Sequence, residues 1–96
     1  MFNRTWDLLS NRWKFFLIYM LADGPVRFGV LRRRCSGISR VTFTAYLRQL
    51  EQEGYVRRNS LSCEGLAVEY SLTTLGRSAL PAVVALIEWG FAEVDE

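Results

Sequence analysis

The 96-residue sequence predicts a mainly helical fold with a small antiparallel β-sheet. Apolar residues recur with helical spacing along most of the chain, whereas residues 67–72 change to a period of two. A tight-turn tetrad, Ser36-Gly37-Ile38-Ser39, separates two of the helical stretches. Helices divided by such a turn and followed at once by a β-hairpin are typical of a winged helix-turn-helix. We therefore expect one domain of this fold over residues 1–96, with a wing of two or three strands.

Two helices are expected before the residues Asp23-Gly24-Pro25, in which glycine and then proline end a helix. The first covers about residues 5–10, and the second begins after Asn11 and is apolar over about ten residues. Beyond the stop, Val26-Arg27 can form a short strand. Helices within residues 5–21 are expected to take part in dimerisation.

The helix-turn-helix is expected over residues 28–53. Its first helix carries Phe28, Leu31 and Cys35 at positions i, i+3 and i+7, which lie on one side of a helix. Ser39 then stands where its hydroxyl can cap the second helix. On the first helix, Arg32 and Arg33 are placed to contact DNA phosphates, since this element of the motif crosses the backbone.

The second helix is expected from about Arg40 to Glu53, with Phe43, Leu47 and Leu50 facing the core. Its opposite side is small and polar, which suits a helix that must enter the roughly 12 Å wide major groove. The residues expected to contact DNA here are Ser39, Arg40, Val41, Thr42, Thr44, Ala45 and Arg48.

An ordinary solvated helix face is the alternative interpretation of this surface. Such a face usually mixes acidic and basic residues, yet no acid occurs between Asp23 and Glu51, while six arginines do. The absence of acids therefore favours DNA contact over simple solvation.

The wing is expected over residues 55–72, with its first strand at 55–59 and its loop at 60–66. Arg57 and Arg58 on the first strand can reach a phosphate or the minor groove. The alternative is that one of them pairs with Glu69 across the hairpin.

The last helix is expected over about residues 74–93, capped by Thr73 and kinked or accommodated in its first turn at Pro81. It is apolar on nearly every side, and a chain of this size lacks the mass to surround it, so a homodimer is expected. In the alternative, a monomer covers this helix with its own N-terminal aromatics. The residues expected at the dimer interface are Trp6, Leu9, Trp13, Leu80, Val83, Val84, Ile87 and Phe91.

The formal net charge of +2 hides a strong partition along the chain. Residues 1–58 hold eleven basic and four acidic groups, a charge of +7, whereas residues 59–96 hold one basic and six acidic groups, a charge of −5. Eleven of the twelve basic residues are arginine, whose guanidinium suits phosphate and guanine edges. The partition indicates that the first part of the chain contacts double-stranded DNA.

Catalysis and metal binding find little support in the composition. The chain has no histidine, which excludes imidazole-based catalysis, and its two cysteines are too few to hold a metal alone. We therefore expect no enzyme activity, no catalytic residues, no metal and no cofactor.

The localisation expected from the sequence is cytoplasmic, with no membrane association. Residues 79–92 form the longest apolar run, which Glu88 interrupts and which is shorter than the roughly 20 residues of a membrane span. Two reduced thiols are then expected. Cys35 is expected in the core, while Cys63 in the wing loop leaves a redox role open as a hypothesis.

The sequence resembles the HxlR-type winged helix-turn-helix regulators of bacteria from about Asp7 to Gly90. The residues that carry the resemblance are Asn11-Arg12-Trp13, Arg27-Phe28, Leu31-Arg32, Ile38-Ser39, Leu47-Arg48-Gln49-Leu50-Glu51 with Gly54, and Glu69-Tyr70-Ser71-Leu72-Thr73-Thr74-Leu75-Gly76 with Trp89. The resemblance implies a DNA-binding homodimer, joined by its terminal helices, whose helix after Ile38-Ser39 reads the major groove. The sensor cysteine that many relatives carry before the first helix has no counterpart in this sequence, so the resemblance does not extend to oxidant sensing.

These observations predict a sequence-specific, DNA-binding transcriptional regulator that acts as a homodimer on a palindromic promoter site. The alternative is a winged-helix module that binds a partner protein through its apolar terminal helices. The sequence does not identify a small-molecule effector. The place expected for one is a cleft between the dimer helices, lined by aromatics such as Trp6, Trp13, Phe16 and Trp89.

Overall fold

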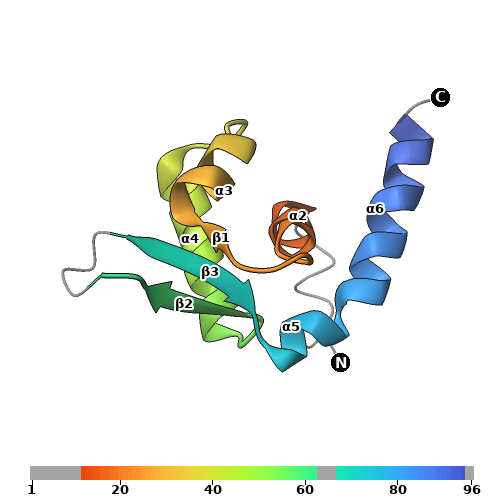
Figure 1. The fold of residues 1–96 in the computed structure, drawn as a ribbon. Coiled ribbons are helices and arrows are strands. Elements are labelled where there is room, and N and C mark those ends of the chain that lie inside the picture. The colour runs from red at the N-terminus through yellow and green to blue at the C-terminus, as the bar shows by residue number, and fades with distance from the viewer. Residues whose placement is uncertain (1–11, 63–66, 95–96) are drawn as a thin grey trace.

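The computed structural model describes residues 12–62 and 67–94 and confirms a winged helix-turn-helix (Figure 1). The short helix expected at residues 5–10 lies outside the described residues. The elements in chain order are α2 (Arg12–Met20), β1 (Val26–Arg27), α3 (Phe28–Arg34), α4 (Arg40–Gln52), β2 (Val56–Ser60), β3 (Val68–Leu72), α5 (Thr74–Ser78) and α6 (Leu80–Val94).

The sheet has three antiparallel strands in the order β1-β3-β2, so the two-residue strand at Val26–Arg27 completes the wing. Strand β3 lies in the middle, with Tyr70 opposite Val26 on one side and opposite Arg58 on the other. The expected alternation is present, because Tyr70 and Leu72 are buried while Glu69 and Ser71 are only half-buried. One face of the wing therefore packs on the helices.

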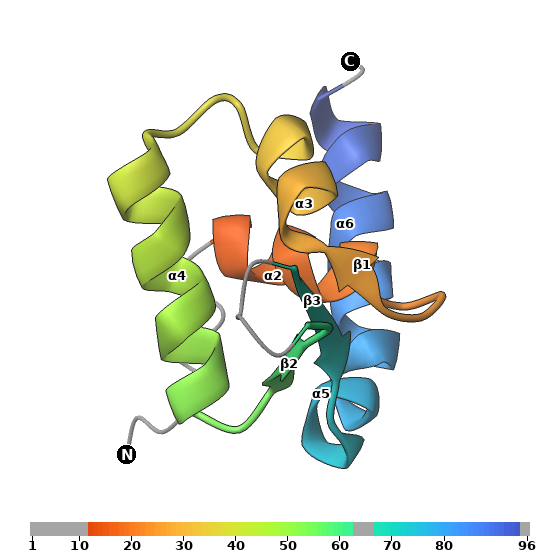
Figure 2. The same ribbon diagram turned by 60° about the vertical axis from the view of Figure 1, so that its left-hand side comes forward.

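The core is formed where α2, α3, α4 and the inner face of the sheet meet. The three residues expected to face inward from α4, Phe43, Leu47 and Leu50, are all buried. Helix α2 lies between α4 and α6 in both views, and Leu17 and Ile18 on it are completely buried (Figures 1 and 2). This packing leaves α4 with the wing on one side of the molecule and α6 on the other.

The turn before α4 is fixed by hydrogen bonds at its cap. Ser39 has extended backbone angles, and its Oγ accepts a hydrogen bond from the backbone N–H of Thr42. This is the N-cap expected from the sequence. At the other end, Gly54 takes a φ of +90°, which an L side chain rarely adopts, so a glycine is needed to turn the chain into β2.

The last helical stretch differs from the single helix expected over residues 74–93. It is divided at Ala79 into α5 and α6, which run in clearly different directions (Figure 1). Pro81, the second residue of α6, has no N–H to continue the α-helical ladder, and the Ala79 N–H instead makes a tighter bond to the Gly76 carbonyl. The chain is therefore divided here into two helices and is not a single kinked helix. The expected cap is confirmed by the hydrogen bond from the Gly76 N–H to Thr73 Oγ1.

A single glycine fixes the approach of α5 to the end of α4. A Cβ added at Gly76 would lie 2.2 Å from the backbone oxygen of Tyr55, which itself accepts a bond from the Thr73 N–H. Backbone cannot yield as a flexible side chain can, so this contact requires glycine.

We predict that Gly76→Ala lowers the free energy of unfolding by about 2 kcal/mol or more, which for a domain of this size is a fall in Tm of about 10 °C. The matched control is Gly29→Ala in α3, where the nearest atom lies 3.9 Å from the added Cβ. This control should be neutral or gain about 0.5 kcal/mol from helix propensity. Thermal unfolding followed by circular dichroism measures both, and equal Tm values for the two variants would contradict the prediction.

Candidate nucleic-acid interface

The outward face of α4 has the small and polar character that the sequence predicts. Val41 is 80% exposed although it is apolar, Arg48 is exposed, and Thr44 and Ala45 are half-buried. An exposed valine side chain makes no favourable interaction with water, whereas it can contact a thymine methyl group in a major groove. These side chains stand on the face opposite Phe43 and Leu47, so a duplex can approach them directly.

The first turn of α4 is held in place by its own side chains. Ser39 Oγ donates to Thr42 Oγ1 at 3.0 Å, while the Arg40 guanidinium lies 5.8 Å from the centre of the Phe28 ring. The cation–π contact ties the start of α4 to the start of α3. All three polar side chains are exposed or half-buried and retain donors or acceptors that face solvent.

The arginines of α3 divide into two roles. Arg32 is half-buried, donates from Nη1 to the Cys35 carbonyl at 3.0 Å, and lies 5.6 Å from the centre of the Phe43 ring. It therefore closes the end of α3 and packs on the core, besides any contact with phosphate. Arg33 and Arg34 are exposed. Of the two residues on this helix that are expected to contact DNA phosphates, Arg33 is the more exposed.

The wing arginines point to opposite faces of the sheet, because successive residues of a strand alternate. Arg58 lies opposite Tyr70, on the face toward α4, and Arg57 lies opposite Ser71 on the other face. Neither stands opposite Glu69, whose neighbours are Asn59 on β2 and Arg27 on β1. The alternative, in which Arg57 or Arg58 pairs with Glu69 across the hairpin, is therefore wrong, because Arg58 is one residue and Arg57 two residues out of register with Glu69.

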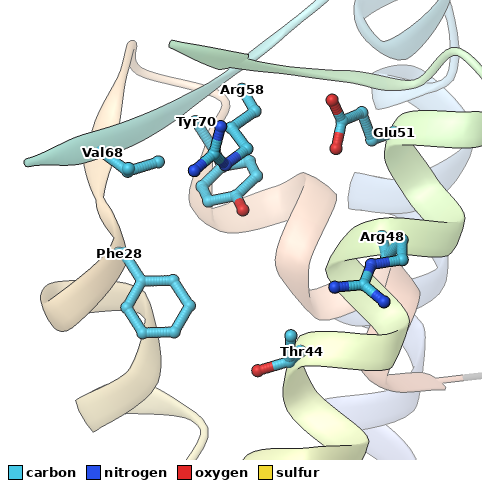
Figure 3. A pocket seen from close by; sticks show the side chains of 7 residues that line it. All are labelled: Phe28, Thr44, Arg48, Glu51, Arg58, Val68 and Tyr70. Atoms are coloured by element: carbon cyan, nitrogen blue, oxygen red, sulfur yellow. The ribbon is translucent and has the colours of Figure 1, made fainter. Parts of the chain in front are cut away.

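A pocket of about 330 Å³ lies between α4 and the wing (Figure 3). Thr44, Arg48 and Glu51 project into it from α4, spaced so that they share one side of that helix. Arg58, Val68 and Tyr70 line it from the wing and Phe28 from α3. The structure thus brings together three of the expected DNA-contacting residues, Thr44, Arg48 and Arg58, at one hollow.

Sequence reasoning missed this pocket and placed a ligand cleft between dimer helices instead. The sequence patterns place Phe28 on the apolar side of its helix and Glu51 at the end of the acid-free stretch, and neither pattern indicates a ligand. The β3 alternation was the available signal, since it sets Tyr70 on the face toward α4. Trp6 of the expected cleft lies outside the described residues.

The expected dimer surface is only partly exposed on α6. Val83 is completely buried within the chain, and Leu80 and Ile87 pack against the core, so Val83 is unavailable to a second copy. Trp89, which the expected interface omitted, is 63% exposed. The side chain of Phe91, like Trp6 and Leu9, lies outside the described residues. Trp13 and Val84 are half-buried.

Cys35 is buried, as expected, and lies beside Arg32 at the end of α3. Burial raises the pKa of its thiol above the ordinary value of 9.0, against a smaller opposing effect of the Arg32 guanidinium. Cys63 lies outside the described residues. In the part of the chain that the structure describes, no three metal-ligating side chains gather at one place, and no helix has the length and hydropathy needed to cross a bilayer.

Comparison with known proteins gives a consistent result over nearly the whole chain. A family model described as HxlR-like helix-turn-helix matches residues 8–96. The Bacillus subtilis protein YybR, named an uncharacterized HTH-type transcriptional regulator, is 40% identical over 91 residues, which are 95% of this chain and 73% of YybR.

Solved structures agree with the family model. The redox regulator HypR in its reduced form superposes with a TM-score of 0.84 at 40% identity, covering 95% of this chain and 90% of HypR. The transcriptional regulator YtfH from Salmonella typhimurium gives a TM-score of 0.83 at 34% identity, covering 96% of this chain and 82% of that one.

We predict that the free energy of unfolding falls as the pH rises above about 9, because the folded protein keeps the Cys35 proton that the unfolded chain releases. Burial raises the pKa of Tyr70 in the same direction from 10.0, so its effect begins at higher pH. Urea unfolding at pH 8 and pH 9.5 measures the loss in a Cys63→Ser background. Adding Cys35→Ala should make this loss smaller, and an unchanged loss would contradict the assignment to Cys35.

Proposed function

Because this chain belongs to the HxlR-like helix-turn-helix family, whose named relatives are transcriptional regulators, we propose that it acts as a homodimer on a palindromic promoter site. DNA binding and regulation of transcription follow from the family and from the winged-helix fold. The assembly, the symmetry of the DNA site and the residues that contact it are our proposal.

The observation that carries the proposal is the outward face of α4. It carries no acid before Glu51, it exposes Val41 and Arg48, and its capped start lies next to the arginines of α3. We propose that α4 enters the major groove and α3 crosses the backbone. The proposed contacts are Arg32, Arg33, Ser39, Arg40, Val41, Thr42, Thr44, Ala45, Arg48, Arg57 and Arg58.

Helix α6 supports the second half of the proposal. Most of its residues are apolar. Val83 is buried in the chain's own core, whereas Trp89 is 63% exposed. An exposed tryptophan on an apolar helix is a typical anchor of an interface. Trp89 therefore joins Leu80, Val84 and Ile87 in the proposed contact. The other proposed members are Trp13 on α2 and three residues whose side chains are not described, Trp6, Leu9 and Phe91.

The arrangement of the helices suits a two-fold complex. Helices α4 and α6 lie on opposite sides of α2, so a second copy packed on α6 would leave α4 outermost (Figures 1 and 2). Two α4 helices in such a dimer can address half-sites about one turn of DNA apart. A protein-interaction module is the less favoured function, because binding a protein through α6 gives no reason for the arginines of α3 and α4.

HypR is described as a redox regulator, but we do not extend redox sensing to this chain. The described thiol, Cys35, is buried and its pKa is raised, whereas a sensor cysteine needs access and thiolate character.

We predict that Arg48→Ala weakens binding to the preferred DNA site by about 1–3 kcal/mol and relaxes the preference at one base position, as loss of a base contact should. Selection of bound sequences from a random DNA pool, followed by titration of selected and random duplexes, measures both effects. Arg77→Ala is the matched control, because Arg77 is exposed on α5 and is not among the proposed DNA contacts. Equal losses on selected and random DNA would make Arg48 a phosphate contact. Failure to enrich any sequence at low salt would contradict the proposed function.

Trp89→Glu is expected to convert the dimer to a folded monomer, because the charge would be buried without a partner at the proposed interface. Light scattering after size exclusion measures the mass, and circular dichroism verifies the fold. Leu61→Glu is the control, since Leu61 is 44% exposed and directly follows β2, whose wing lies away from α6 in Figure 1. The interface proposal is wrong if the wild-type chain is a monomer at micromolar concentration, or if the Trp89 variant remains a dimer.

A further inference from the structure

The pocket between α4 and the wing carries an arrangement that DNA contact does not explain. Arg48, Glu51 and Arg58 bring two positive charges and one negative charge to its rim. In the part of the chain that the structure describes, the one ion pair within 4 Å joins Lys14 to Glu53, so these three groups are not paired with one another. The carboxylate of Glu51 repels phosphate, so it does not serve the phosphate contacts of this surface.

The opposite part of the same pocket is apolar. Phe28 and Val68 lie across from the α4 side chains, and the Tyr70 hydroxyl points into the space between the two groups (Figure 3). Thr44 adds a second hydroxyl at the α4 side. A tyrosine hydroxyl keeps its proton at neutral pH, and burial raises the pKa of Tyr70 further, so this hydroxyl can donate a hydrogen bond. The pocket therefore has charged groups on both its α4 side and its wing side, two hydroxyl groups, and an apolar part formed by Phe28 and Val68.

We propose that this pocket binds a small α-amino acid with an apolar side chain. Arg48 and Arg58 take the carboxylate, Glu51 takes the ammonium group, and Phe28, Val68 and the Tyr70 ring contact the side chain. Such a zwitterion complements all three charges, whereas a simple carboxylate leaves Glu51 facing it and a simple amine leaves two guanidinium groups unmet. The volume of about 330 Å³ is at the small end of ligand sites and limits the ligand to a molecule of this size.

Binding there has a consequence for DNA, which rests on the proposed function. Thr44, Arg48 and Arg58 are proposed DNA contacts as well as pocket residues, so the amino acid and the duplex compete for the same side chains. Each ligand must then weaken the other by the same factor. At an amino acid concentration ten times its Kd, the apparent affinity for DNA falls about tenfold.

The test uses L-leucine and two analogues that each lack one charged group, 4-methylpentanoate and 3-methylbutan-1-amine. Each is titrated into the full-length, DNA-free protein by calorimetry and by chemical-shift changes in NMR spectra. We expect leucine to bind about tenfold or more tightly than either analogue, because each missing group forfeits a charge-assisted hydrogen bond. No detectable leucine binding at millimolar concentration, or equal affinity for all three, overturns the proposal whether or not the protein binds DNA.

Variants separate the two charged contacts. Glu51→Gln should abolish the preference for leucine over 4-methylpentanoate, and Arg58→Gln should weaken leucine and 4-methylpentanoate alike by about tenfold. Arg77→Gln, which removes an exposed arginine from α5, should leave leucine binding unchanged. A Glu51 variant that keeps the full preference overturns the assigned ammonium contact. Leucine that binds the free protein but leaves its affinity for the selected duplex unchanged overturns the competition alone.

Discussion

Burial of one side of α4 is the constraint on which the rest of the molecule depends. Phe43, Leu47 and Leu50 are at most 1% exposed, and together they fix the rotation of the helix about its axis. Once that rotation is fixed, Val41 must face outward, and Thr44, Arg48 and Glu51 must line the side of α4 next to the wing. The helical spacing of these three core residues thus determines which α4 side chains can contact a duplex and which line the pocket.

The arginines work through aromatic rings as well as through charge. Arg32 lies over Phe43 and Arg40 over Phe28, and the two rings meet edge to face at 5.3 Å. These contacts join α3 to the start of α4 across the turn, so the two helices of the motif keep a fixed relation. The acid-free stretch would otherwise hold like charges in close proximity without any compensating contact. Its electrostatic cost is partly offset by the same rings that set the geometry.

The sequence predicts most of the helices and strands, but it does not predict which of them contact one another in space. Spacing alone predicted α4, its cap at Ser39 and its buried stripe, because those are local properties of a helix. The break at Ala79 was underestimated, since the effect of Pro81 depends on whether α6 is free to turn away from α5. The sequence also does not determine the register across the hairpin, because a shift of one residue would place Arg58 opposite Glu69 instead of Tyr70. The pocket followed from that register and from the meeting of three elements distant in sequence.

Helix α2 connects the two sides of the molecule on which the proposals rest. It packs against α4 on one side and α6 on the other, and its Lys14 is buried at 4% exposure. The Lys14 ammonium lies 3.4 Å from Glu53, the residue that ends α4. Separating a buried ion pair of this kind lowers the stability of the fold, because the lysine would remain desolvated without an opposite charge beside it. The position of α4 relative to α2 is therefore firmly set. In the proposed dimer, any change in how two copies pack through α6 must then move the two DNA-facing surfaces as rigid bodies. The spacing of the proposed half-sites would depend on the angle between the two α6 helices, and not on flexibility within the helix-turn-helix.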